Sequence, residues 1–157
     1  MSEALVITRI FDAPIELVWH AWTDPEHFKL LWGPKIFTCP VCKMEPKLGG
    51  KFLWAMRWPD GRDVYNTGEF IEFEPMTKIS FTNKFADADG NVVPASYHGH
   101  GDDFKEDMAT YVEFEDLGTK TKMTLRHTGL PVGEMGKMAN IGWNESLDKL
   151  AASLQAS

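Results

Sequence analysis

A series of segments in which apolar side chains occupy every second position constrains the fold of this chain most. These segments follow one another between residues 51 and 128 and are separated by turn signals such as Pro59-Asp60-Gly61. Alternation of this kind turns one face of a strand towards a core. The predicted strands are Lys51–Trp58, Tyr65–Glu74, Lys78–Phe85, Ala109–Glu115 and Lys120–Thr128. Consecutive strands joined by short turns favour an antiparallel meander.

Helix signals stand at both ends of this strand series. At the start, Ala4–Phe11 predicts a strand, and Asp12-Ala13-Pro14 begins a helix with proline at its first position. Thr23-Asp24-Pro25-Glu26 repeats the signal with a capping side chain, so a second short helix should follow and end near Trp32-Gly33-Pro34. At the other end, a long amphipathic helix is predicted from about Val132 to Ala152.

The predicted elements together define a fold class. An antiparallel sheet with one apolar face needs a cover, and the C-terminal helix is the only long amphipathic element available. Its apolar stripe comprises Ala139, Trp143, Leu147, Leu150 and Leu154. We therefore expect an α+β fold in which a curved antiparallel sheet of about six to seven strands packs around the C-terminal helix. The length of 157 residues fits a single domain spanning residues 1–157.

Charge and composition exclude several classes of function. The formal net charge is −7, whereas binding to nucleic acid or to an anionic membrane requires a positive surface. No segment approaches the roughly 20 apolar residues that span a bilayer. The start, Met1-Ser2-Glu3-Ala4-Leu5, lacks the basic and apolar regions of a secretory signal, so we expect a cytoplasmic protein. The small number of cysteines, two, fits a reducing compartment.

Motifs spread over nearly the whole chain resemble one known family. The N-terminal part contains Arg9-Ile10-Phe11-Asp12-Ala13-Pro14, Val18-Trp19-His20-Ala21-Trp22-Thr23-Asp24-Pro25-Glu26 and Trp32-Gly33-Pro34. The middle contains Gly49-Gly50-Lys51-Phe52, Met56, Pro59-Asp60-Gly61 and Gly68. The C-terminal part contains Thr121-Lys122-Met123-Thr124-Leu125-Arg126-His127 and Gly142-Trp143-Asn144-Glu145-Ser146-Leu147-Asp148-Lys149-Leu150. In order and spacing these motifs resemble the activator of heat-shock-protein-90 ATPase homologue-like family, within the START-like (SRPBCC) superfamily.

The resemblance implies a fold and a range of functions. START-like domains have a helix-grip fold, in which the sheet and the long helix enclose a deep cavity. Many superfamily members bind small apolar molecules there, and some carry out cyclisations or other reactions. Eukaryotic co-chaperones of the family carry an additional N-terminal domain that contacts the chaperone, for which a chain of 157 residues leaves no room. We therefore expect a ligand-binding module first, an enzyme second and a regulator of a heat-shock ATPase third.

A set of aromatic and methionine side chains, with two polar residues among them, forms the candidate ligand site. Methionine adapts to ligands of varied shape, and a few polar groups in an apolar cavity orient a ligand. The candidate ligand-binding residues are Trp54, Met56, Phe81, Asn83, Met123, His127 and Trp143. Asn83 and His127 would orient a polar group, and the others would supply apolar contacts. The same pattern also fits a plain core, in which a buried His127 is hydrogen bonded to a protein group.

The enzyme alternative uses the same cavity. His127 would act as general acid or base, with Glu69 on a neighbouring predicted strand assisting it. The sequence contains no phosphate-binding glycine motif, no nucleophile elbow and no helical zinc-protease motif. We therefore assign no catalytic residue, metal ligand or cofactor, and we expect a small apolar molecule as the partner.

Cys39-Pro40-Val41-Cys42 has the spacing of metal-binding and redox motifs. A zinc site would need a second pair of ligands, which is missing, and a reactive thiolate is typical of a helix N-terminus. The surrounding segment Ile36–Met44 is instead predicted to be extended. Extension would place the two Cα atoms about 10 Å apart, beyond the roughly 7 Å limit for a disulfide. The prediction is therefore two small apolar strand residues.

A long polar loop covers residues 91–107 and contains Tyr97-His98-Gly99-His100-Gly101-Asp102-Asp103. Two histidines and two carboxylates are side chains that bind a divalent metal. The glycines at alternate positions favour a flexible segment instead, either a solvated loop or a lid over the mouth of the cavity.

Overall fold

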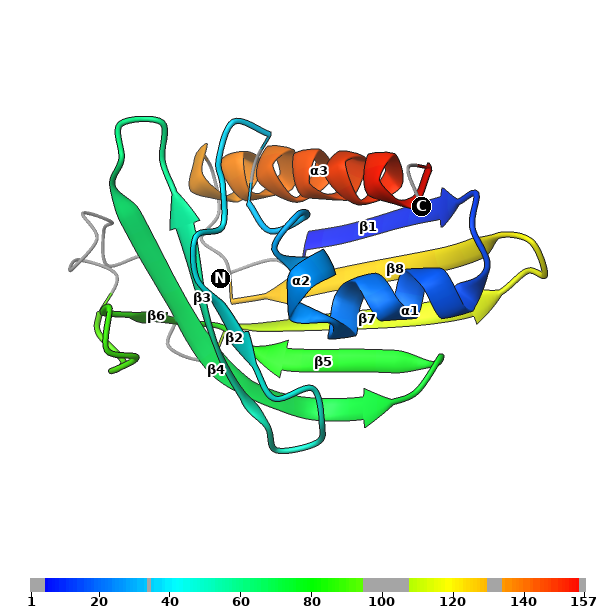
Figure 1. The fold of residues 1–157 in the computed structure, drawn as a ribbon, viewed down its shortest axis with the longest axis horizontal. Helices are drawn as coiled ribbons and strands as arrows, with labels where there is room; N and C mark the ends of the chain where they lie inside the picture. Colours follow the sequence, from blue (N-terminus) through cyan, green and yellow to red (C-terminus); the bar gives the residue numbers. More distant parts are fainter. Residues whose placement is uncertain (1–4, 34, 95–107, 130–133, 156–157) are drawn as a thin grey trace.

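The structure, a computed structural model, describes residues 5–33, 35–94, 108–129 and 134–155. Within these residues the chain forms eight strands and three helices, which Figure 1 labels. They are β1 (Leu5–Phe11), α1 (Ile15–Thr23), α2 (Pro25–Phe28), β2 (Cys42–Met44), β3 (Lys51–Arg57), β4 (Asp63–Glu74), β5 (Lys78–Thr82), β6 (Lys84–Ala86), β7 (Ala109–Asp116), β8 (Thr121–Thr128) and α3 (Glu134–Gln155). The strands pair antiparallel in the order β1-β8-β7-β5-β4-β3-β2, and the short β6 pairs with β4.

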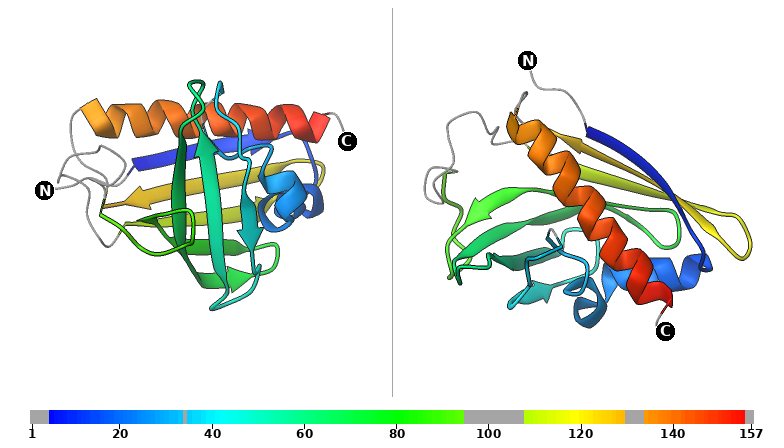
Figure 2. Two further views of the ribbon diagram at one scale, coloured as in Figure 1. Left: turned by 60° about the vertical axis from the view of Figure 1, so that its left-hand side comes forward. Right: turned by 90° about the horizontal axis from the view of Figure 1, so that it is seen from above.

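The sheet is strongly curved, and the helices lie on its concave side (Figures 1 and 2). α1 and α2 sit within the curve, and α3 runs across the open side of the sheet next to β1. The prediction of an α+β fold, with a curved antiparallel sheet around a long C-terminal helix and two short helices after the first strand, is confirmed. Among the described residues, no helix is both long and apolar enough to cross a membrane.

Alternation along the strands buries one face of the sheet under the helices. In the sheet register Ile7 pairs with Leu125, Leu125 with Val112, and Val112 with Ile79, and all four side chains are buried. Among the α3 side chains that the structure describes, the buried apolar ones belong to the predicted stripe and are Trp143, Leu147, Leu150 and Leu154. Because burying one such leucine contributes about 2 kcal/mol, this stripe is the main anchor of α3.

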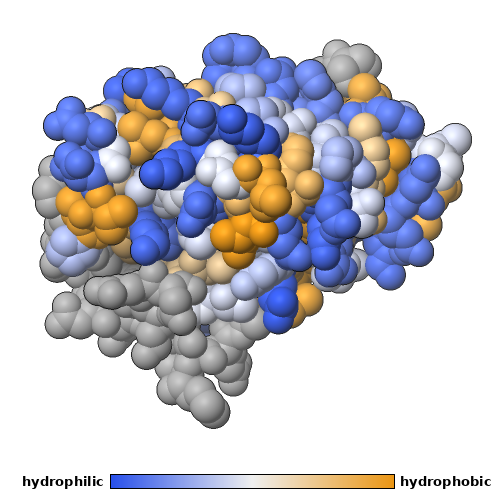
Figure 3. Space-filling view, turned by 90° about the horizontal axis from the view of Figure 1, so that it is seen from below, coloured by the Kyte–Doolittle hydropathy of each residue, from blue (hydrophilic) through white to orange (hydrophobic). Residues whose placement is uncertain are grey.

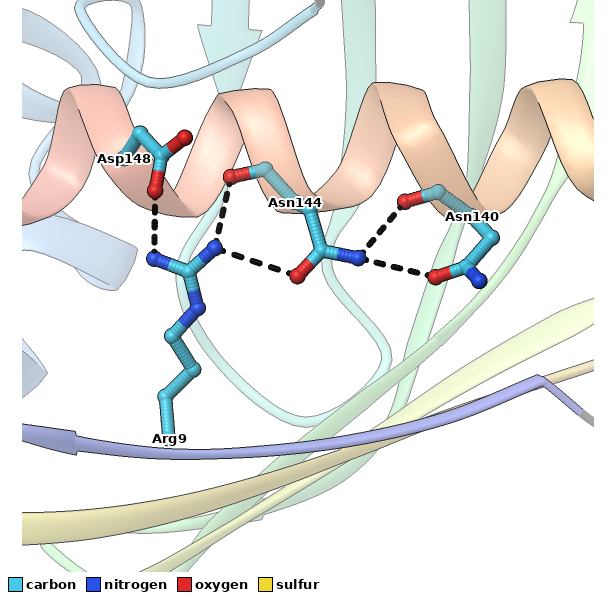
Figure 4. Close-up of polar contacts among 4 residues, drawn as sticks. All are labelled: Arg9, Asn140, Asn144 and Asp148. Atoms are coloured by element: carbon cyan, nitrogen blue, oxygen red, sulfur yellow. Dashed lines mark hydrogen bonds and ion pairs between the residues drawn. The ribbon is translucent and has the colours of Figure 1, made fainter.

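Arg9 on β1 ties α3 to the edge of the sheet (Figure 4). Its guanidinium donates to Asp148 Oδ1 at 2.7 Å, to the Asn144 backbone oxygen at 2.9 Å and to the Asn144 side-chain oxygen at 3.1 Å. The Asn144 amide in turn donates to the backbone and side-chain oxygens of Asn140. A planar guanidinium serves several acceptors in one fixed geometry, so this contact helps to set the position of α3 along β1.

The starts of the two short helices differ from the predicted ones. Pro14 is the N-cap of α1 rather than its first helical residue, with φ −68° and ψ 157° in the extended region. Its carbonyl oxygen accepts the first backbone hydrogen bonds of the helix. Asp24 caps α2 without a side-chain hydrogen bond, because its carboxylate pairs with His20 Nε2 at 3.1 Å instead. Pro25 lies in the first turn of α2, as predicted.

The predicted strand Lys78–Phe85 divides in two at Asn83. β5 pairs with the C-terminal half of β4, whereas β6 pairs with its first half. Gly68 lies at this crossing, where an added Cβ would collide with the carbonyl oxygen of Thr82. Only glycine lets the two backbones approach so closely, and alternation of apolar side chains does not reveal such a requirement.

Candidate functional site

Trp54 is the centre of a buried aromatic cluster. Its side chain is fully buried on β3, and its ring centroid lies 3.8 Å from that of Phe52. Phe28 in α2 and Trp32 just after it pack against Trp54 at 4.3 and 4.8 Å. Phe81 on β5 meets the indole edge-on at 5.2 Å. The structure therefore brings together two of the predicted ligand-site residues, Trp54 and Phe81.

Trp143 on α3 links this cluster to His127 on β8. The Trp143 ring stacks on Trp22 at 6.4 Å and meets Trp32 edge-on at 5.7 Å. Its indole Nε1 donates a hydrogen bond to His127 Nδ1 at 3.0 Å. Trp143 and His127 are only 7% and 8% exposed. The histidine predicted to point towards the terminal helix is thus in direct contact with a tryptophan of that helix.

The surroundings of His127 decide where its proton lies. Burial lowers the pKa of His127 to about 4, so the ring is neutral at neutral pH. Because Nδ1 accepts the hydrogen bond from Trp143, the single ring proton resides on Nε2. Nε2 is buried and has no hydrogen-bond partner among the described residues. His127 therefore presents an unused donor to the interior.

Unpaired donors recur through the aromatic cluster. The indole Nε1 atoms of Trp22, Trp32 and Trp54 are buried, and none has an acceptor within the part of the chain that the structure describes. Buried polar atoms are normally paired, and an indole N–H can only donate. Together with His127 Nε2, these atoms make the interior rich in unused donors. A molecule bound there would gain most by carrying an acceptor, such as a carbonyl or ether oxygen.

Asn83 lies beside this region, at the break between β5 and β6. Its side-chain oxygen accepts a hydrogen bond from the Thr110 hydroxyl at 2.8 Å, and both side chains are buried. In the sheet register Thr110 stands between Phe81 and His127. Thr110 is absent from the predicted site, although its alternation with Val112 places it on the inward face of β7.

Of the two methionines of the predicted site, Met123 belongs to the core cluster that contains Trp54 and Trp143, and Met56 packs against that cluster. Met123 is fully buried, but it pairs with Phe114, four residues along β8 from His127. Met56 is half-buried and packs beside Gly33, where its Cγ would lie 3.1 Å from an added Cβ. Alternation correctly predicts which face a side chain occupies, but it does not say how far along the strand the ligand site extends.

Glu69 cannot assist His127 as the enzyme alternative expects. Glu69 is exposed on β4, while the next residue, Phe70, is buried and pairs with Phe81. Successive side chains of a strand point to opposite faces, so the Glu69 carboxylate lies on the outer side of the sheet. The expectation is wrong for two reasons: β5 and β7 separate β4 from β8, and Glu69 lies on the outer face of the sheet.

Two pockets lie beside α3. The larger, of about 740 Å³, lies between α2, residues 37–43 and Lys149 of α3. The smaller, of about 340 Å³, lies between the end of β1 and the C-terminal part of α3. Neither pocket is lined by any of the seven predicted ligand-site residues. The larger one has the size of a small-molecule site and is lined by charged groups as well as apolar ones.

Cys39 and Cys42 both line the larger pocket, and the segment around them is extended only in part, at Thr38 and in β2. β3 pairs with this segment at Thr38 and again at Val41. Between these two pairing points, a single residue of β3 lies opposite two residues of the other segment, Cys39 and Pro40. Such a two-to-one pairing is a β-bulge. The bend at Pro40 lies between the two cysteines. The prediction of a regular extended strand through both cysteines is therefore wrong.

The metal site considered at Tyr97–Asp103 lies outside the described residues. Among the residues that are described, no group of three or more His, Cys, Asp and Glu side chains is arranged to hold a metal ion. The chemistry that the interior site offers is hydrogen-bond donation within an apolar setting.

Comparison with known proteins gives this geometry a context. The family model described as Activator of Hsp90 ATPase homolog 1-like protein matches residues 12–155. A protein from Arthrobacter aurescens, solved by NMR, is 26% identical with a TM-score of 0.80, over 100% of this chain and 92% of that one. A crystal structure from Chromobacterium violaceum is 24% identical with a TM-score of 0.80, over 96% of both chains. The AHSA1 protein from Silicibacter pomeroyi is 22% identical with a TM-score of 0.78, over 98% and 99%. No curated protein matches the chain at a significant level.

Proposed function

Because this chain belongs to the family of Activator of Hsp90 ATPase homolog 1-like proteins, we propose that it binds a small hydrophobic or aromatic molecule between the sheet and α3. The resemblance of the family to START-like domains that bind apolar molecules supports the proposal. The observation that carries it is the set of buried donors for which no described residue supplies an acceptor, namely His127 Nε2 and the indole nitrogens of Trp22, Trp32 and Trp54. The preferred ligand accordingly has a hydrogen-bond acceptor on an apolar or aromatic body.

The outer surface supports an interior site rather than a surface one. On the face opposite α3, hydrophobic groups are separated by hydrophilic ones (Figure 3). Exposed large hydrophobic residues such as Val6, Ile71 and Val92 lie in β1, in β4 and after β6. Single exposed hydrophobic residues are normal on a protein surface, whereas a docking surface is usually contiguous.

Two probes of nearly identical shape test the proposal. Acetonaphthone carries a carbonyl oxygen, and isopropenylnaphthalene carries a methylene group in its place. We expect the ketone to bind roughly tenfold more tightly, which is the effect of one hydrogen bond worth about 1.4 kcal/mol net. Binding is measured by quenching of tryptophan fluorescence. NMR spectra of the indole N–H groups should show the signals of Trp22, Trp32 or Trp54 moving on addition of the ketone.

The controls use one interior and one exterior variant. Trp54→Phe should reduce the preference for the ketone, because it removes an indole donor that pairs with no described residue and frees no other donor. Glu69→Ala should leave the preference unchanged, because Glu69 is exposed on the outer face. Circular dichroism confirms that both variants are folded. Equal binding of the two probes by the wild-type protein, or no binding of either, would contradict the proposal.

A regulator of a heat-shock ATPase is the second candidate, because the family description names this activity. Such a regulator acts through its surface and does not need an occupied interior. Adding the protein to purified Hsp90 should then raise the rate of ATP hydrolysis, and His127→Leu should stimulate as well as the wild-type protein does. An unchanged ATPase rate over a wide range of protein concentrations would rule this candidate out.

A further inference from the structure

The cysteine pair in the larger pocket lies outside the proposed ligand site and has chemistry of its own. Cys39 and Cys42 are both free and half-buried, and both line the pocket of about 740 Å³ beside α2 and α3. The two cysteines lie on either side of Pro40 in the β-bulge, and Cys42 pairs with Trp54 in the β2–β3 register. The sheet therefore fixes the backbone of Cys42, while the pocket gives small molecules access to both cysteines.

The surroundings of Cys39 favour its thiolate form. As a thiol, Cys39 donates to the Val41 carbonyl oxygen at 3.2 Å. The neighbouring Cys42 thiol, as a hydrogen-bond donor, is the largest cause lowering the pKa of Cys39. Lys149 and Lys29, which also line the pocket, lower the pKa of Cys39 further through their charges, whereas burial opposes this shift. A thiolate held by donors and cations in a partly open site is a reactive one.

Cys42 has the opposite character. The hydrogen bond with Cys39 raises the pKa of the Cys42 thiol, and burial and the carboxylate of Glu26 raise it further. At neutral pH Cys42 therefore stays a thiol beside the sulfur of Cys39. This asymmetry gives one cysteine the properties of an attacking nucleophile and leaves the other positioned to react with it afterwards.

We propose that Cys39 and Cys42 form a peroxide-sensitive dithiol site, in which Cys39 is the nucleophile and Cys42 closes a reversible disulfide. The geometry that carries the proposal is the position of both cysteines on the wall of one pocket, together with Lys29 and Lys149, and the size of that pocket, which admits a hydroperoxide. Lys149 also donates to the Phe37 carbonyl oxygen at 2.8 Å, which holds its ammonium group at the pocket.

The reaction consists of two steps. In the first, the Cys39 thiolate attacks one oxygen of a hydroperoxide; a sulfur–oxygen bond forms, the oxygen–oxygen bond breaks, and the leaving alkoxide takes up the proton that Cys39 had lost. In the second, the Cys42 sulfur attacks the Cys39 sulfenic acid; the disulfide forms, the sulfur–oxygen bond breaks, and hydroxide leaves with the Cys42 proton as water. Two thiols and one hydroperoxide thus become one disulfide, one alcohol and one water.

Intact-mass spectrometry tests the proposal directly, since the chain contains only these two cysteines. The reduced protein is treated with one equivalent of hydrogen peroxide. It should lose the mass of two hydrogen atoms as a monomer and regain it with dithiothreitol. Cys42→Ser should instead accumulate a sulfenic acid that dimedone traps, because no second thiol is present to close the disulfide. Cys39→Ser should react with peroxide at least about tenfold more slowly, because Cys42 remains protonated.

A matched pair of variants tests the role of the neighbouring donor. Cys42→Ser keeps a hydroxyl that can donate to the Cys39 thiolate, whereas Cys42→Ala does not. Alkylation of Cys39 by iodoacetamide at neutral pH should therefore be several-fold faster in Cys42→Ser than in Cys42→Ala. Equal reactivity of Cys39→Ser and Cys42→Ser towards peroxide, or oxidation that gives only disulfide-linked dimers, would overturn the proposal.

Discussion

At the residue scale, the interior contains a neutral histidine whose hydrogen-bond partner, an indole N–H, can only donate. His127 accepts from Trp143 at one ring nitrogen and keeps the other N–H unpaired among the described residues. Charging this ring would require burying an imidazolium without an acceptor, which is costly. The folded protein therefore resists protonation of His127, and an unfolded chain does not. This difference must appear as a dependence of stability on pH.

The first prediction concerns this dependence. The pKa of His127 is about 4 in the folded protein against 6.5 for an unperturbed histidine. Above pH 6.5 the ring is neutral in both states; as the pH falls from 6.5 to 4, only the unfolded chain takes up the proton. The unfolding free energy should therefore fall by about 3 kcal/mol through this window because of His127 alone. Urea denaturation at a series of pH values measures it.

The variant His127→Gln isolates the contribution of this one group. Glutamine is polar and does not titrate, so carboxylates and other histidines contribute equally to both proteins and cancel in the difference. The stability advantage of the wild-type protein should shrink as the pH falls below 6.5. Parallel curves for the two proteins would show that the His127 ring reaches solvent or finds an acceptor.

The sequence predicted part of this site for a simple reason. His127 and Trp143 were placed on facing sides of a strand and a helix, where periodicity alone assigns faces, and they are hydrogen bonded. Trp22 and Trp32 were not predicted as site residues. They reach Trp143 because the short helices fold into the curve of the sheet. That approach depends on tertiary packing, which a local pattern does not encode.

At the scale of elements, the contact between β1 and α3 combines partly buried hydrogen bonds with an exposed ion pair. Asp148 is 68% exposed on its side chain, so its ion pair with Arg9 is screened by solvent. The two hydrogen bonds to Asn144 are partly buried and hold the guanidinium in place (Figure 4). The structural role of Arg9 therefore lies mainly in its contact with Asn144 rather than in the ion pair.

The second prediction separates the two parts. Arg9→Met keeps an apolar stem but loses every hydrogen bond to α3, and should lower the unfolding free energy by roughly 1.5–3 kcal/mol. Asp148→Ala removes only the exposed ion pair and should cost less than about 1 kcal/mol. Arg9→Lys should not restore full stability, because a single ammonium cannot match the guanidinium fork. Chemical denaturation measures all three; equal losses for Arg9→Met and Asp148→Ala would show that the ion pair dominates.

Elements were predicted where a regular period persists, and missed where it breaks. The strands β7 and β8 have bounds within one residue of the predicted hairpin, because alternation continues through both. The bulge at Cys39 and Pro40 and the break at Asn83 were not predicted. Each of these irregularities depends on which residues of another strand lie opposite it. The same holds for the change of pairing partner along β4 and for the close backbone approach at Gly68. Such long-range register is absent from a local pattern.

At the scale of the whole molecule, α3 both closes the sheet and covers the proposed ligand site. Its buried stripe contacts the same interior that contains Trp22 and His127. Two modes of ligand entry follow. Either α3 separates from the sheet as an independent unit, or it stays docked and only side chains rearrange. The cooperativity of unfolding distinguishes these modes, since an independently moving helix would melt separately.

The third prediction is that α3 unfolds together with the sheet. Leu150 is fully buried and Ile141 is 60% exposed on the same helix. Leu150→Ala should lower the unfolding free energy by roughly 2–5 kcal/mol, and Ile141→Ala by less than about 0.5 kcal/mol. In both variants the transitions followed by circular dichroism and by tryptophan fluorescence should coincide, because Trp143 joins α3 to the aromatic cluster. A fluorescence transition that precedes the loss of secondary structure in Leu150→Ala would show that α3 detaches first, and ligand entry would then proceed by movement of the helix.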